Sequence, residues 1–159
     1  MPDMTNPYAA DLGDRDALEA FADTPFKTRA LLDGWTDAQF ERSYAPGKWT
    51  TRQVLVHLAQ TELALGARMR FALTEDGYHA QNFSQDDWLT VDAALDARAA
   101  LDVYTTLRRM NVAMVRGLSA AQRERRFEHP EYGTLSVGWV IAQMAGHDLH
   151  HLKIMKNLE

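Results

Sequence analysis

Apolar side chains recur along most of this chain at intervals of three and four residues, a spacing that places them on one face of a helix. No alternating run of β-branched residues bounded by turn residues predicts a strand. We therefore expect an all-α fold. The pattern predicts four long helices, at roughly Asp14–Leu32, Thr50 to just before Gly77, Val91–Arg116 and Ser136–Asn157.

Residues typical of helix ends support these boundaries. Thr50 and Gln53 have the spacing of a capping box, and Ser136 is a suitable N-cap. Pro25 lies inside the first predicted helix, where its missing N–H should bend or interrupt the helix. The stretch DGYHAQNFSQDDW, residues 76–88, is expected to form a loop that crosses a bundle end or covers a pocket.

Two segments, GWTDAQFERS at 34–43 and GLSAAQRERR at 117–126, share Gly, Ala, Gln, Glu and Arg at matching positions. Each contains a Thr/Ser-x-x-Gln capping box and stands between two predicted long helices. The chain therefore reads as two helical hairpins built to one plan, while convergent capping chemistry would give the same similarity. Either interpretation predicts a four-helix bundle.

The length of 159 residues suits one domain. We expect a disordered or loosely ordered N-terminus at 1–13 and a single domain at 14–159. The polar, acidic N-terminus lacks the features of an export signal, so a cytoplasmic location is expected. Neither the composition nor any apolar run predicts a membrane partner.

Charge and cysteine content exclude several functions. The chain has 17 Lys and Arg against 22 Asp and Glu, a net charge of −5, so its field should repel nucleic acid. The sequence has no cysteine, which excludes disulfides, thiolate metal ligands and a cysteine nucleophile. Any metal ligands must therefore be nitrogen or oxygen atoms.

Three of the six histidines lie in GHDLHHLKIM, residues 146–155. On a helical wheel His147 and His151 fall within the buried stripe, whereas His150 falls toward its flank. Imidazoles at i and i+4 can reach one ion, although two hydrogen-bonded or solvated histidines would give the same pattern. His57, at the border of the apolar stripe of the second predicted helix, is a third candidate ligand or a core residue. Three histidines would leave a metal position open for water or substrate.

Other side chains could serve such a site. Glu62 is a weak candidate for a general base, and Asp148 is another; either could instead only support the ligands or lie on the surface. Arg68 could bind an anionic substrate or extend to water, and we favour the latter. His79 and His129 lie in predicted loops and are expected to be solvated.

The segments PGKWTTRQVLVHLAQTE and GHDLHHLKIM resemble those of the DinB-like superfamily of damage-inducible helical proteins, which includes YfiT-type metal-dependent hydrolase-like and thiol-transferase-like members. The resemblance covers about Leu18–Leu158. In that family a histidine of the second helix joins a His-x-x-x-His pair of the last helix. The resemblance therefore implies His57, His147 and His151 as the metal ligands.

The resemblance also implies a four-helix bundle with a long crossover connection, commonly a homodimer, that holds a divalent metal near one end. Zinc and nickel both suit three imidazoles. The implied function is a metal-dependent enzyme acting on a small molecule, either a hydrolase or a thiol S-transferase with a low-molecular-weight thiol as cosubstrate. The alternative is a non-catalytic, stress-related helical dimer that binds a structural metal or a small ligand.

Overall fold

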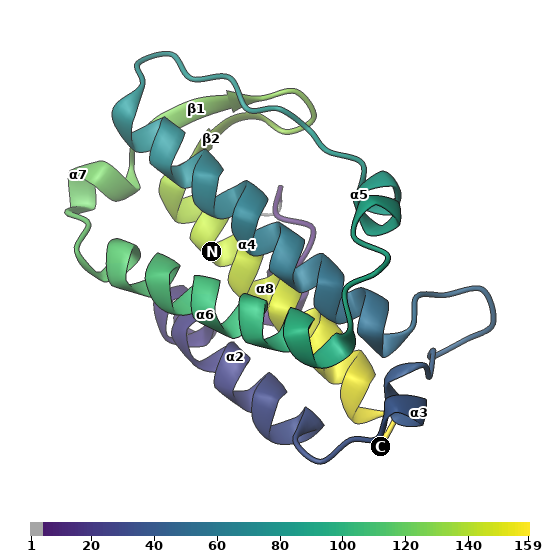
Figure 1. Cartoon of the computed structure of the whole chain (residues 1–159). Helices are drawn as coiled ribbons and strands as arrows, with labels where there is room; N and C mark the ends of the chain where they lie inside the picture. The colour runs from purple at the N-terminus through teal and green to yellow at the C-terminus, as the bar shows by residue number, and fades with distance from the viewer. Residues whose placement is uncertain (1–4) are drawn as a thin grey trace.

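The structure of the protein is a computed structural model, which is described over residues 5–159 (Figure 1). Its long helices, α2 (Ala17–Leu32), α4 (Thr51–Thr74), α6 (Ala97–Arg116) and α8 (Val137–Lys156), form a bundle. The predicted four-helix bundle is confirmed. None of the helices within residues 5–159 is long and apolar enough to span a membrane.

Consecutive helices are not all neighbours in this bundle. Helix α4 packs against α6 and α8, and α2 packs against the same two helices. Helices α2 and α4 therefore occupy opposite corners of the bundle, as do α6 and α8. The sequence predicted that α2 with α4, and α6 with α8, would form hairpins of neighbouring helices. Instead, crossovers at residues 33–50 and 117–136 connect the two helices of each pair across the bundle.

The two similar segments lie in these two crossovers and fold alike. They form the short helices α3 (Asp37–Phe40) and α7 (Ala120–Arg123). Thr36 with Gln39, and Ser119 with Gln122, make the predicted capping boxes, in which each side chain bonds the other residue's backbone N–H. Local capping chemistry therefore shapes both crossovers in the same way.

The remaining long-helix boundaries follow their caps. Thr50 and Gln53 form the capping box of α4, and the Ser136 hydroxyl accepts the Trp139 N–H at the start of α8, as predicted. The third predicted helix is wrong at its start. Helix α6 begins at Ala97 rather than at Val91, because the Asp96 carboxylate accepts the Ala99 N–H and caps the helix there, whereas Val91 is the last residue of a separate short helix, α5 (Gln85–Val91). Helix α5 also occupies the end of the loop expected at 76–88.

The expectation of no strand was wrong. Strands β1 (Arg126–His129) and β2 (Gly133–Ser136) form an antiparallel hairpin near one end of the bundle (Figure 1). Each strand has four residues, so alternation is too brief to be recognised in the sequence. Phe127 and Leu135 face each other across the hairpin and are buried.

Helix α2 runs through Pro25 without interruption. The Phe21 carbonyl, whose helical donor would be the missing N–H of residue 25, instead accepts a hydrogen bond from Arg108 Nη1 at 2.7 Å. The interruption expected at Pro25 is therefore absent because a side chain of α6 supplies the donor that the proline lacks.

The N-terminal segment at 5–13 packs on the bundle, in contrast to the loose order expected for 1–13; residues 1–4 lie outside the described part of the chain. It includes the short helix α1 (Ala9–Leu12), which contacts α8. A Cβ atom at Gly146 would lie 2.5 Å from the Tyr8 carbonyl oxygen, so only glycine allows this approach. Burial of Ala9 and Leu12 fixes the segment further.

Candidate metal centre

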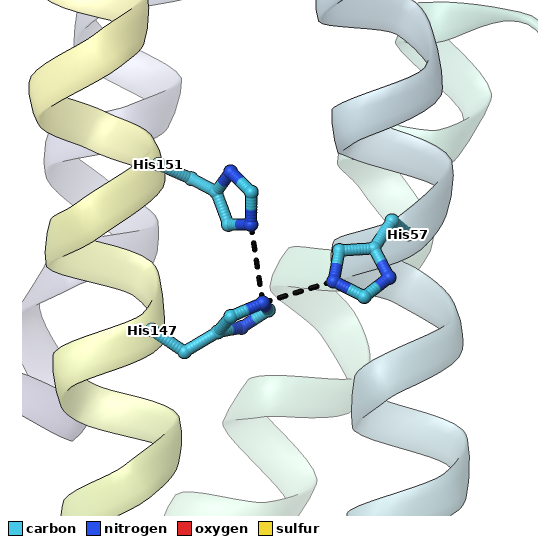
Figure 2. Close-up of side chains that lie close together, drawn as sticks. All are labelled: His57, His147 and His151. Atoms are coloured by element: carbon cyan, nitrogen blue, oxygen red, sulfur yellow. Dashed lines mark hydrogen bonds between the residues drawn. The ribbon is translucent and has the colours of Figure 1, made fainter. Parts of the chain in front are cut away.

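Three histidines from two helices converge between α4 and α8 (Figure 2). The Nε2 atom of His147 lies 2.9 Å from Nε2 of His57 and 3.1 Å from Nε2 of His151. His147 and His151 are one helical turn apart on α8 and face His57 on α4. The structure therefore brings the three predicted ligands together.

The three Nε2 atoms cannot satisfy one another by hydrogen bonding. A neutral imidazole has one N–H, so Nε2 of His147 is either a donor to one neighbour or an acceptor. If His147 Nε2 carries the proton, it can donate to only one of His57 and His151 and has no lone pair for the other; if it does not, its single lone pair can accept from only one of them. A cation that accepts a lone pair from each ring would satisfy all three atoms at once.

The three rings are neutral near pH 7, so their lone pairs are available. Burial lowers the pKa of His57 to about 4. Burial, together with the neighbouring His57 and His150, lowers the pKa of His151 to about 3. Burial holds the pKa of His147 well below its usual value, and the neighbouring histidines, of which His151 has the largest effect, lower it further. Neutral imidazole is the form that binds metal.

Packing orients the rings that would bind the ion. The Trp49 ring lies 5.0 Å from the His57 ring, and the Tyr8 ring meets the His147 ring edge-on at 5.0 Å. The Nδ1 atoms of His57 and His147 are buried and have no hydrogen-bond partner in the described structure. Aromatic contacts therefore replace the hydrogen bond that often fixes a ligand histidine.

The distances fit a small divalent cation. Ligand nitrogens at about 2.0–2.1 Å from a tetrahedral zinc ion lie about 3.3 Å apart, so an outward shift of a few tenths of an ångström would admit it. His150 faces elsewhere: its Nδ1 atom lies 3.4 Å from Asp11 Oδ2, and its ring lies 5.5 Å from the Tyr8 ring, tilted by 53°. This agrees with its predicted place on the flank of the helix.

The candidate base Glu62 belongs to a buried ion-pair network. Its Oε1 atom accepts hydrogen bonds from Arg108 Nε at 2.8 Å and from Arg108 Nη2, and its Oε2 atom accepts one from Asn111 at 2.8 Å. Glu62 is also absent from the residues that line the cavity beside the histidines. The structure thus gives Glu62 a role in packing the bundle and none at the ligand atoms.

Asp148 completes this network from α8. Arg108 Nη1 lies 2.6 Å from Asp148 Oδ2, which also accepts the Thr24 hydroxyl at 2.9 Å. Burial acts to lower the pKa of Arg108, but the two carboxylates raise it above its usual value, so the guanidinium stays charged. Asp148 follows His147 directly, and therefore the network fixes the helical turn that carries two of the three histidines.

A cavity of about 170 Å³ opens beside the histidine cluster. His57 and His147 form one part of its wall, whereas His151 lines a neighbouring pocket. Further polar side chains of α4, α8, the N-terminal segment, the loop after α4 and the β1–β2 hairpin line the cavity as well: Tyr8, Arg68, Asn82, His129, Tyr132 and Gln143. The site therefore combines clustered ligand atoms with a space that a small molecule can enter.

Two residues in this wall differ from their prediction. Arg68 was expected to extend to water, but its side chain is only 7% exposed. His129 was expected to be solvated and is 6% exposed, whereas His79 is exposed as expected. The β1–β2 hairpin explains why Arg68 and His129 are buried, because it pairs with the connection that follows α4. Ala80 N–H donates to the Glu128 carbonyl, and Glu128 N–H donates to the Tyr78 carbonyl.

Sequence reasoning missed Tyr8, Glu131, Tyr132 and Gln143 as residues of the cavity wall. Gln143 had a usable signal, since it lies one helical turn before His147 on the same face. Tyr8 and the hairpin residues had none, because their positions depend on contacts between segments far apart in the chain.

The fold and the site define a helical-bundle protein with a three-histidine cluster of the kind that binds a divalent metal. The chain belongs to the DinB superfamily, which it matches over residues 20–155. It is 33% identical, over 89% of this chain and 83% of the relative, to a protein of Oceanobacillus iheyensis named "Putative metal-dependent hydrolase". A protein of Halalkalibacterium halodurans with the same name is 26% identical over 80% of this chain and 75% of its own.

A solved structure shows the same fold. It is that of YfiT from Bacillus subtilis, described as "a probable metal-dependent hydrolase with an unusual four-helix bundle topology". The two structures superpose with a TM-score of 0.82 at 24% sequence identity, over 89% of this chain and 83% of YfiT. The crossovers that place consecutive helices at opposite corners are therefore shared with a known bundle.

Proposed function

We propose that this chain is a metal-dependent hydrolase in which His57, His147 and His151 bind one divalent ion through their Nε2 atoms. The observation that carries the proposal is the convergence of three neutral imidazoles beside a cavity. Three protein ligands leave a position open, as in catalytic rather than structural zinc sites. The names of the relatives support a hydrolase.

A zinc or nickel ion suits a site made only of imidazole nitrogens. When bound, such an ion lowers the pKa of its water to about 7 and so supplies a nucleophile near neutral pH. The choice between the two metals, the homodimer and the cytoplasmic location stay predictions.

The chain's own residues bind, orient and donate protons. The Trp49 and Tyr8 rings hold His57 and His147 in place. Burial, with Tyr132 and Asp11 nearby, raises the pKa of Tyr8, so its phenol keeps its proton at neutral pH. Tyr8 lines the cavity and can therefore donate a hydrogen bond to a substrate oxygen on which negative charge develops.

The test is metal-dependent turnover by untagged protein loaded with zinc or nickel, screened against chromogenic esters, amides and phosphate esters. We expect hydrolysis that needs the ion and is lost in His147→Ala. His150→Ala is the matched control, since His150 is adjacent to the cluster on α8 but pairs with Asp11, and it should keep its activity.

Two outcomes would contradict the proposal. Turnover that appears only when a low-molecular-weight thiol and an electrophile are supplied would identify the thiol S-transferase instead. No metal-dependent turnover under any condition, with metal still bound, would favour the non-catalytic dimer.

A further inference from the structure

A buried arginine without an acidic partner forms part of the cavity wall. The Arg68 guanidinium donates from Nη2 to the Gln81 carbonyl at 2.9 Å, and the Tyr78 hydroxyl is its other polar neighbour. In the described part of the chain, no carboxylate forms an ion pair with Arg68. By contrast, the buried Arg108 forms ion pairs with two carboxylates, those of Glu62 and Asp148. A buried cation without a counter-ion is costly, and a bound anion would remove that cost.

His129 places a second hydrogen-bond donor in the same wall. Its Nδ1 atom accepts the backbone N–H groups of Glu131 at 3.1 Å and Tyr132 at 3.2 Å, so Nδ1 carries no proton. Burial and the charge of Arg68 lower the pKa of His129, and the ring is neutral near pH 7. The proton of the neutral ring is therefore on Nε2, on the side of the ring away from the hairpin turn.

The rest of the wall favours an anion too. Tyr8, Tyr132 and Gln143 bring hydroxyl and amide groups that can donate hydrogen bonds. Among the residues that line the cavity, the acidic side chain is Glu131. Its charge acts to raise the pKa of His129 and Tyr132, but Glu131 is exposed, so solvent and salt screen its charge. A divalent ion at the histidines would make the cavity still more positive.

One stripe of α4 runs along the cavity from the histidines to the arginine. His57, Thr61, Leu65 and Arg68 all line it. At the backbone, His57 and Arg68 are separated by three helical turns, about 16 Å. Side chains on a helix lean toward its N-terminus, which brings the guanidinium back toward His57. The cavity therefore has a metal-ligand part and an anion-binding part that one elongated small molecule can reach together.

We infer that the substrate is a small molecule with an anionic end, a carboxylate or a phosphate, which Arg68 and His129 bind while its reactive bond lies at the three histidines. The size fits, because about 170 Å³ is below the range of about 300–1,000 Å³ found for drug-sized ligands. The inference rests on the proposed function, since it names the substrate class of that same site.

Isothermal titration calorimetry of the zinc-loaded full chain tests the inference, with inorganic phosphate in one arm and glutarate in the other. At least one anion should bind with a stoichiometry of one per chain, and the arm that binds identifies phosphate or carboxylate. Arg68→Met should weaken that binding by about tenfold or more, since it removes a charged donor. Arg68→Lys should recover only part of the affinity, because lysine lacks the planar fork.

Arg109→Met is the matched control, since Arg109 is an exposed arginine of α6 and its loss changes the net charge equally. It should keep the affinity within about twofold, a change that screening by salt allows. His129→Phe should weaken binding as well, and it keeps the inference testable if Arg68→Met does not fold. Circular dichroism of each variant establishes its folding.

Two results would overturn the inference: wild-type protein that binds neither anion at millimolar concentration, or equal affinity in wild type and Arg68→Met, which would place the anion on the ion alone. Metal content measured on the same samples separates this inference from the proposed function. Anion binding that depends on Arg68 in protein that takes up no ion would support the anion site and contradict the metal-dependent function.

Discussion

Replacing Arg108 with methionine removes a cation that joins all four long helices. The guanidinium extends from α6 to Glu62 on α4, to Asp148 on α8 and to the Phe21 carbonyl on α2. Methionine keeps an apolar stem of similar reach, so the variant removes the charge and the donors with little loss of packing. Both carboxylates then remain buried without a cation, although Asn111 still donates to Glu62 and Thr24 still donates to Asp148.

The expected cost is large for a chain of this size. Breaking a buried ion pair by removing one partner costs about 3–5 kcal/mol, against a total unfolding free energy of about 5–15 kcal/mol for a typical domain. Arg108→Met should therefore lose about 4 kcal/mol of unfolding free energy. Arg108→Lys keeps the charge and should lose less, which preserves a measurable variant if the methionine protein is unfolded.

Pro25 provides a specific test of how this arginine acts. With Arg108 present, the Phe21 carbonyl already has a donor, and Pro25→Ala adds a second to it. In the Arg108→Met background the same carbonyl has none, so the N–H restored by Pro25→Ala should recover an additional amount of about 1–2 kcal/mol. The two substitutions should thus be non-additive.

Urea unfolding at pH 7, followed by circular dichroism for the wild type, both single variants and the double variant, measures the cost and the coupling. A loss below about 1 kcal/mol in Arg108→Met would refute the importance of the buried network. An equal effect of Pro25→Ala in both backgrounds would refute the explanation of how α2 tolerates its proline.

Two further predictions concern the histidine cluster and its cover. Taking the metal-free protein from pH 7.5 to pH 5 should cost about 2 kcal/mol of unfolding free energy for each of His57 and His151. In the unfolded chain these histidines bind protons below about pH 6.5. In the folded protein their pKa values are about 4 and about 3, so both rings stay neutral at pH 5. Urea titrations at the two pH values measure this, and unchanged stability would contradict it. Gly146→Ala should displace Tyr8, because the Tyr8 carbonyl oxygen would lie 2.5 Å from the new Cβ atom. Amide hydrogen exchange in residues 5–12 should therefore become faster. Unchanged protection would show that the close contact at Gly146 does not hold this segment in place.

Features fixed by residues close in sequence were predictable. The capping boxes at Thr50 and Ser119 depend on side chains three residues apart, and the predicted boxes form. The i and i+4 spacing of His147 and His151 placed both rings on one face of α8. The place of His57 on the second predicted helix made it a candidate, but the choice between a ligand and a core residue required the family resemblance, because spacing within one helix cannot show which residues of another helix face it.

Features that depend on contacts between distant segments were not predictable. Glu62 looked like a free carboxylate near a metal ligand, yet it pairs with Arg108, 46 residues away. Pro25 carried a clue, since a proline within a helix leaves a carbonyl that some other donor must satisfy. The burial of Arg68 and His129 required the hairpin, whose four-residue strands are too short to be recognised.

X-ray absorption spectroscopy of the untagged protein, loaded with one equivalent of zinc, tests most directly whether His57, His147 and His151 bind one ion. We predict a zinc ion with three imidazole nitrogens at about 2.0–2.1 Å and one oxygen ligand in the open position. His151→Ala should lose an imidazole from the spectrum and most of its metal, whereas His150→Ala should match the wild type. An unchanged zinc environment in His151→Ala, or fewer than three imidazoles in the wild type, would contradict the three-histidine site.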